Sequence, residues 1–192
     1  MDVAAAIRNR RAVRDYEPKD LERSLIAEVV DEAIWAPSGM NRQPWSFLVI
    51  EGRDVLAACS AEAKAFMLSQ AADHPELAAV KGLLEQADFN IFYNAPALIL
   101  ICATASDEMA VKDCCLAAQT LMLAAHDRGL GTCWIGFSEG WLNTPQAKRR
   151  LGIPEAVRPV APIIIGHPKA GPGHAPERRP AELRYLEATA GG

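Results

Sequence analysis

Four arginines stand close together near the start of the chain, at positions 8, 10, 11 and 14 of the stretch RNRRAVR. The chain as a whole is acidic, with a formal net charge of −4, so this local positive charge indicates a place that binds an anion. If residues 10–14 are extended, Arg10 and Arg14 lie about 13 Å apart, far enough to hold two ends of one elongated ligand. The alternative is a solvated basic helix end, where cations favour the helix dipole.

A second stretch, APSGMNRQPW at residues 36–45, is rich in short hydrogen-bonding side chains. Ser38, Asn41 and Gln43 can bond to a polar ligand, and Gly39 allows the backbone to approach it closely. An ordinary surface loop is the alternative. The combination of prolines, polar side chains and a Trp in so short a stretch favours a binding loop.

A third stretch, RGLGTCWIG at residues 128–136, carries glycines at 129, 131 and 136. Glycine frees the backbone to present N–H groups to a ligand. A helix C-cap followed by the start of a strand is the alternative, and it accounts for Gly129. It does not account for Gly136, so we expect the backbone there to face a ligand.

The spacing of apolar residues predicts the elements that position these stretches. Strands are expected at residues 45–52, 95–103, 131–136 and 160–166, and helices at 2–9, 25–34, 54–67, 75–87 and 113–128. A further helix opens with Thr144 as N-cap and Pro145 at N1, and it ends at Gly152. The helix over 113–128 is apolar almost all round, which predicts a central helix or one shared between two chains.

The composition changes after residue 166, where prolines and glycines become frequent up to residue 180. Such a segment cannot form a core of its own, so we expect an extended arm or a disordered tail. The following residues 181–186 have apolar spacing suited to docking. The length fits a single domain over residues 1–192, with 166–192 as the arm.

Several function classes are excluded by missing motifs. The chain has no P-loop, no nucleophile elbow and no properly spaced dinucleotide-binding glycines. Its histidines have no metal-ligand spacing, and its acidic balance disfavours broad nucleic-acid binding. No apolar run is long enough to cross a membrane. The odd number of cysteines, five, favours a reducing, cytoplasmic location over a disulfide framework.

The order of these stretches resembles the nitroreductase family of flavoproteins over nearly the whole chain. RRAVRDY is followed by APSGMNRQPW, NAPALILI, AAQTLMLAAHDRGLGTCWIG and an Arg-Arg-Pro near the end. The resemblance implies an α+β fold of three layers, with a central, mostly antiparallel sheet flanked by helices. It also implies a homodimer with FMN at the subunit interface and a domain-swapped C-terminal arm that docks on the partner.

The resemblance also implies where each part of FMN binds. Arg10 and Arg11 match the phosphate and ribityl end, and Arg14 matches the pyrimidine edge. The family usually has Ser where this chain has Ala12, so position 12 can offer only its backbone N–H. Arg178 or Arg179 matches the C-terminal contact to the phosphate.

Two further segments match the flavin ring and its surroundings. The loop that reaches FMN from the other subunit matches Pro37, Ser38, Gly39 and Asn41, with Gln43 just beyond. The strand end that faces the isoalloxazine matches Cys133, Trp134, Ile135 and Gly136, with the N–H of Ile135 or Gly136 near flavin N5.

The activity implied by the resemblance is two-electron, ping-pong reduction of nitroaromatics, quinones or similar acceptors by NADH or NADPH. The flavin would carry the chemistry, with no metal and no catalytic side chain. Three alternatives stay open. One is a flavoenzyme of the same fold with another task, such as enone reduction, dehalogenation or flavin breakdown. Another is a flavin-binding redox sensor with little turnover, and the last is a basic-armed protein that binds an acidic partner.

Overall fold

The structure, a computed structural model, describes residues 2–71, 74–170 and 176–186. Its helices are α1 (Val3–Asn9), α2 (Arg23–Ala33), α3 (Arg53–Gln70), α4 (Lys81–Leu84), α5 (Glu108–Asp127), α6 (Glu139–Leu142) and α7 (Pro145–Leu151). Short 3-10 turns are η1 (Gly39–Asn41), η2 (Pro75–Ala79) and η3 (Gly136–Ser138). The strands are β1 (Trp45–Glu51), β2 (Ala97–Ala103), β3 (Gly131–Trp134) and β4 (Arg158–Gly166).

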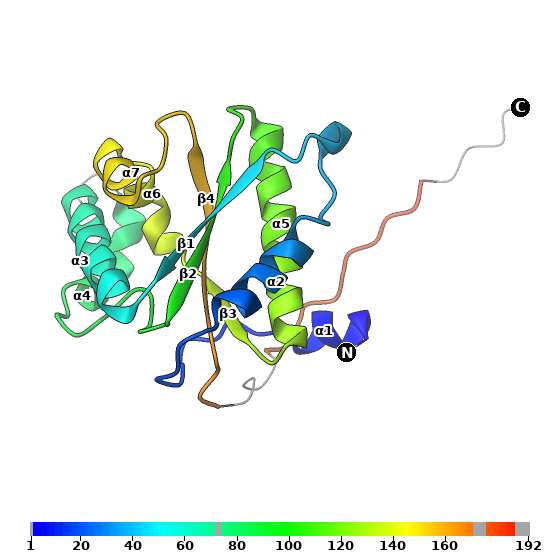
Figure 1. The fold of residues 1–192 in the computed structure, drawn as a ribbon, viewed down its shortest axis with the longest axis horizontal. Coiled ribbons are helices and arrows are strands. Elements are labelled where there is room, and N and C mark those ends of the chain that lie inside the picture. Colours follow the sequence, from blue (N-terminus) through cyan, green and yellow to red (C-terminus); the bar gives the residue numbers. More distant parts are fainter. Residues whose placement is uncertain (1, 72–73, 171–175, 187–192) are drawn as a thin grey trace, which may run out of the picture.

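The four strands form one antiparallel sheet in the order β1-β2-β4-β3. The strand β2 is buried on both faces, because alternate side chains of a strand point to opposite sides. Ile99 and Ile101 pack with α2 and α5, whereas Leu98 and Leu100 pack with α3 and α6. Figure 1 shows the resulting three layers, with the sheet between two groups of helices. The predicted three-layer α+β fold is confirmed.

The arginine-rich stretch leaves the first helix and runs extended beside β3. Asp2 caps α1 by accepting a hydrogen bond from the Ala5 N–H, and the helix ends at Asn9. The Val13 N–H then donates to the carbonyl of Thr132 at 2.9 Å. Of the two alternatives for residues 10–14, the structure therefore shows the extended one, and it brings them beside the third stretch.

The long helix α5 starts earlier than predicted and is exposed on one side. It begins five residues before the expected Asp113, because Asp107 caps it by accepting from the Ala110 N–H at 3.2 Å. One side packs against the sheet and α2, but Leu116 is 45% exposed. Within a single chain α5 is therefore buried on one side, and the alternative that it is shared between two chains stays a prediction.

Two other boundaries also differ from the sequence prediction. The helix expected at 75–87 is broken into η2 and α4. The strand expected at 131–136 ends at Trp134, because η3 begins at Gly136. The end of the third stretch is thus a turn rather than strand.

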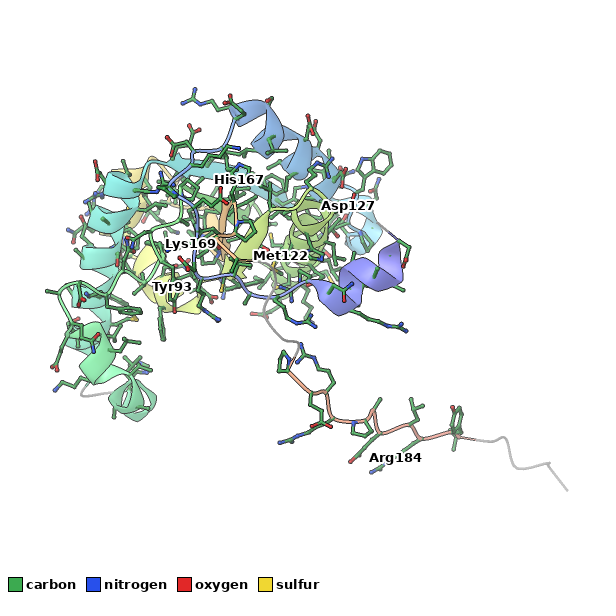
Figure 2. All side chains as sticks on the ribbon, turned by 90° about the horizontal axis from the view of Figure 1, so that it is seen from below. Tyr93, Met122, Asp127, His167, Lys169 and Arg184 are labelled. Atoms are coloured by element: carbon green, nitrogen blue, oxygen red, sulfur yellow. The ribbon has the colours of Figure 1, made fainter. Side chains whose placement is uncertain are left out.

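The C-terminal segment stays attached to the body for a few residues after β4. The Glu17 N–H donates to the carbonyl of His167 at 2.9 Å, and the Lys169 N–H donates to the carbonyl of Asp15 at 3.1 Å. Parts of the predicted arm, residues 171–175 and 187–192, lie outside the described residues. Residues 176–186 are exposed and without helix or strand, and Figure 2 shows Arg184 far from the body of the chain. No helix among the described residues is both long and apolar enough to span a membrane.

Candidate functional site

A pocket of about 390 Å³ opens where the arginine-rich stretch meets the end of β3. Its lining residues are Arg14, Ile91, Tyr93, Trp134, Ile135, Gly136 and Phe137. Arg14 comes from the first predicted stretch, and Trp134, Ile135 and Gly136 come from the third. The fold therefore joins two of the three stretches that the sequence singled out.

The arginines near this pocket are not paired with a carboxylate in the described part of the chain. Burial lowers the pKa of Arg10, and the charges of Arg11 and Arg178 lower it further. The buried Cys133 lies close enough to interact with both Arg10 and Arg14. Among the described ion pairs, none joins Arg10, Arg11 or Arg14 to a carboxylate. An anion bound here would supply the missing counter-charge.

Arg11 lines a different pocket from Arg14. It faces a cavity of about 370 Å³ whose lining also includes Val13 and His126. Its Nη1 donates to the carbonyl of Arg10 at 2.6 Å, and its buried Nε has no hydrogen-bond partner in the described structure. Alternate residues of an extended segment face opposite sides, so Arg14 and Arg11 are directed apart even though Arg11 lies near Arg10. Ala12, between them, is exposed and bridges to Thr132 of β3.

At the end of β3 the structure separates the two candidate N–H groups. The Ile135 N–H donates to the carbonyl of Pro162 at 2.8 Å, so it is already used. The Gly136 N–H has no hydrogen bond to any described residue. A Cβ built on Gly136 would meet only Glu139 Oε1, at 3.8 Å. Nothing in the described chain requires glycine here, and its N–H is free to bond to a ligand.

The loop of the second stretch is anchored on the first turns of α5. The Gly39 N–H donates to Oδ1 of Asp113 at 3.1 Å. The guanidinium of Arg42 donates to both carboxylate oxygens of Asp107, at 2.8 and 3.1 Å. Pro37, just before these residues, is exposed. These contacts hold the loop at the N-terminal end of α5.

The backbone inside this loop is strained. Met40, Asn41 and Gln43 have φ values of 56°, 55° and 49°, in the left-handed region that costs non-glycine residues energy. The Oγ of Ser38 accepts from the Gln43 N–H at 3.0 Å, and the Gln43 amide donates to Asn41 Oδ1 at 3.1 Å. Internal hydrogen bonds therefore maintain a conformation that the backbone alone disfavours.

Within one chain this loop lies far from Arg10 and Arg11. Arg10 and Arg11 influence the pKa of His126, near the C-terminal end of α5, whereas the loop contacts Asp113. The rise of a helix over that interval is about 20 Å. Figure 1 shows the same separation, with the loop before β1 at one end of α5 and α1 at the other.

The C-terminal arginines are exposed. Arg178 lies near enough to Arg10 to lower its pKa, and its Nη1 donates to the carbonyl of Pro176 at 3.2 Å. Arg179 has no hydrogen bond or ion pair to another described residue. The structure therefore brings Arg178 toward the arginine-rich segment and gives no contact for Arg179.

Three lining residues, Ile91, Tyr93 and Phe137, escaped the sequence analysis. The guanidinium of Arg14 lies 5.7 Å from the ring centroid of Tyr93, a cation–π contact. Tyr93 itself has a φ of 51°. Of these three residues, only Phe137 could have been predicted from the sequence, because it follows Gly136 directly. The described residues contain no cluster of His, Cys, Asp and Glu that could hold a metal ion.

Comparisons with known proteins agree with this architecture. The sequence profile of the nitroreductase family matches residues 7–167. A Methanothermobacter thermautotrophicus protein named "Putative NADH dehydrogenase/NAD(P)H nitroreductase" is 32% identical, covering 90% of this chain and 81% of that protein. A 4-nitrobenzoate reductase of Pseudomonas putida is also 32% identical, covering 69% of this chain and 71% of that protein.

A solved structure extends the likeness to three dimensions. The crystal structure of a nitroreductase with bound FMN from Desulfitobacterium hafniense superposes with a TM-score of 0.79 at 26% identity, covering 97% of this chain and 100% of that one. The family profile spans the arginine-rich stretch, the loop on α5 and every strand of the sheet, and it ends just after β4, at residue 167. The chain belongs to the nitroreductase family.

Proposed function

We propose that this protein is an FMN-dependent oxidoreductase that uses NADH or NADPH to reduce nitroaromatics, quinones or similar acceptors by two electrons in a ping-pong cycle. The observation that carries the proposal is the meeting of Arg14 with the free N–H of Gly136 at one pocket, beside Cys133, which also interacts with Arg10. The FMN in the Desulfitobacterium hafniense relative and the nitroreductase names of other relatives support it.

The pocket residues fit FMN in charge and in shape. Arg10, with Arg178 or Arg179, would hold the phosphate, because guanidinium groups bind phosphate with paired hydrogen bonds. Arg11 would add positive charge near the phosphate end of FMN, although it lines the neighbouring pocket. Arg14 would lie at the pyrimidine edge of the ring.

The end of β3 would face the ring itself. Cys133, Trp134, Ile135 and Gly136 would form the wall, and the Gly136 N–H would donate to flavin N5. At position 12 only the backbone of Ala12 is available for the phosphate. FMN bound there supplies the hydride and electron transfer, for which the chain has no redox group of its own.

A second copy of the chain would complete the site. Pro37, Ser38, Gly39, Asn41 and Gln43 lie at the far end of α5 from Arg10 and Arg11, so they would reach FMN from a partner subunit. Large apolar side chains are exposed on α5 and the neighbouring loop, which a partner could cover; these include Leu116, Met109, Trp35 and Met40.

The proposal extends to the arm and to the compartment. We propose a single FMN-binding domain over residues 1–192, whose arm within 166–192 leaves the body after Lys169 and docks on the partner. Its exposed Leu183, Tyr185 and Leu186 would find apolar contacts there. All five cysteines are free, which supports a cytoplasmic location.

Two measurements test this proposal. Purified protein should be yellow and release FMN on denaturation. Initial rates with NADH or NADPH and 4-nitrobenzoate, at several fixed donor concentrations, should give parallel double-reciprocal lines. Intersecting lines would reject the single shared pocket. Fast bleaching of the flavin by NAD(P)H without nitroaromatic or quinone turnover would favour a same-fold enzyme with another task, and slow or absent bleaching would favour a redox sensor.

A further inference from the structure

We propose that Glu139 is a positioning residue that holds the indole of Trp134 in place as a wall of the flavin pocket. This role rests on the proposed function, because the wall matters only if FMN occupies the pocket. Glu139 is the first residue of α6 and is not among the residues that line the pocket. It would act through Trp134 rather than by touching the ring.

The contact between the two side chains is short and charge-assisted. Trp134 Nε1 donates to Glu139 Oε1 at 2.5 Å, in partly buried surroundings. The indole has a single donor, so this bond uses its whole hydrogen-bonding capacity. Hydrogen bonds to a carboxylate are stronger than those to neutral acceptors. The bond therefore favours one orientation of the indole.

The carboxylate is presented from a rigid turn. The side-chain amide of Asn143 donates to the carbonyl of Glu139 at 2.9 Å and to that of Pro159 at 3.0 Å, which ties α6 to β4. The buried Oγ of Ser138 donates to the carbonyl of Ile135 at 2.9 Å, inside the same turn. Residues on both sides of Gly136 are thus fixed independently of Trp134.

Glu139 also lies beside the free N–H of the pocket. The same Oε1 is 3.8 Å from the position a Cβ on Gly136 would occupy. Its charge further raises the pKa of Cys115 on α5, which burial already raises. The Glu139 carboxylate therefore lies close to Trp134, to the turn at Gly136 and to Cys115 on α5.

Packing alone does not explain the orientation of Trp134. Its indole is only partly buried, whereas the nearby Trp141 is 4% exposed and belongs to the core. A partly exposed indole at a pocket edge can rotate unless a polar contact holds it. In the described structure, the N–H of that indole donates its hydrogen bond to Glu139 Oε1, which is therefore the contact that fixes its orientation.

The test follows the Trp134 indole N–H in ¹H–¹⁵N spectra of the FMN-loaded protein. The chain has four Trp residues, and Trp134→Phe identifies the signal. In Glu139→Ala the signal should move upfield and its hydrogen exchange should accelerate about tenfold or more, as expected for loss of a charged hydrogen bond. Glu139→Gln keeps an acceptor oxygen and should restore most of both properties. Glu155→Ala, which removes an exposed carboxylate beyond α7, should leave the signal unchanged.

The effect on the pocket is measured separately. The visible circular dichroism of bound FMN should change in Glu139→Ala. The Kd of FMN should also rise about threefold or more, because an indole that is no longer held weakens the contact with the ring. Glu139→Gln should resemble the wild type. Adding Glu139→Ala to Trp134→Phe should cause no further change, because the pair acts as one unit.

Each outcome decides a different claim. An unchanged indole signal in Glu139→Ala would overturn the hydrogen bond. A shifted signal with unchanged flavin dichroism and Kd would overturn the positioning role while leaving the proposed function intact. Wild-type protein that binds no FMN would reject the proposed function, and the positioning role with it. If Glu139→Ala fails to fold, Trp134→Phe tests the same wall and should reproduce the change in flavin dichroism.

Discussion

The backbone N–H of Gly39 donates a hydrogen bond of 3.1 Å to Oδ1 of Asp113, a carboxylate that is 2% exposed. The other oxygen, Oδ2, is buried without a partner in the described structure. A buried charge is costly unless it is bonded, so this contact matters for the fold. It also connects the strained loop at residues 37–43 directly to α5.

Replacing Asp113 should loosen that loop. Asp113→Ala removes the acceptor for Gly39 and should lower the free energy of unfolding by about 1–3 kcal/mol. The FMN Kd should also rise, if the loop reaches FMN across the dimer. Asp113→Asn keeps an acceptor oxygen and should have smaller effects on both. Asp31→Ala, at an exposed position of α2, is the control, and equal losses in all three variants would contradict the anchoring role.

The arginine near the proposed phosphate site should control flavin affinity. Arg10→Ala should weaken FMN binding about tenfold or more, because a charge-assisted hydrogen bond is worth roughly 1.5–3 kcal/mol. Fluorescence titration of the flavin-free protein measures this Kd. Arg8→Ala, on the exposed side of α1, removes the same charge two residues away and should change Kd little. An unchanged Kd for Arg10→Ala would remove Arg10 from the site.

Local sequence signals predicted the elements well where short-range chemistry decides them. Thr144 caps α7 by accepting from the Ala147 N–H, and Gly152 ends it with a φ of 67°, as predicted. The start of α5 was misplaced because its cap, Asp107, lies before the apolar residues that indicate the helix. Propensity locates the middle of an element better than its ends.

The sequence predicted only some of the residues that line the pocket. Arg14 and Gly136 stand out by type and spacing, and the structure joins them. Tyr93 and Ile91 reach the pocket from the segment before β2, through long-range packing that leaves no local pattern. The opposite directions of Arg11 and Arg14 follow from the extended backbone, but which pocket each faces depends on the position of β3.

The exposed side of α5 should carry the subunit contact. Sedimentation at low micromolar concentration should show twice the mass of the chain. Leu116→Asp places a charge on a residue that is 45% exposed and should give a monomer with weaker FMN binding. Val55→Asp makes the same change at another 45% exposed position, on α3 at the opposite face of the sheet, and should stay dimeric. A flavin-loaded wild-type monomer would contradict a shared site.

Acid should destabilise the protein partly through His126. Burial, Arg10 and Arg11 lower the pKa of His126, whereas in the unfolded chain it titrates near its usual value of about 6.5. Between those two values the unfolded state binds more protons, so this contribution to stability is full above about pH 6.5 and is lost as the pH falls through the folded pKa. Urea unfolding of wild type and His126→Asn across roughly pH 5–8 should show the wild type losing stability relative to the variant on acidification. A pH-independent difference would show that His126 is not perturbed.

Gly136 allows stability and ligand access to be separated at a single position. Nothing in the described chain lies closer than 3.8 Å to the Cβ that an alanine would add. The exposed site should therefore accept Gly136→Ala within about 0.5 kcal/mol of free energy of unfolding in the flavin-free protein. A flat ring lying against that backbone has no such room, so FMN binding should weaken and hydride transfer should slow, and Gly136→Val should abolish turnover.

The matched control for this substitution is Gly82→Ala, where an added Cβ also meets nothing within 4 Å, on α4 away from the pocket. It should leave stability, FMN binding and turnover unchanged. Stopped-flow bleaching of bound FMN by NADH or NADPH separates ring access from phosphate binding, because Arg10 and its neighbours stay intact in every variant. Turnover equal to wild type in Gly136→Val would reject the proposed ring contact, since a branched side chain and a flavin cannot occupy the same side of that backbone.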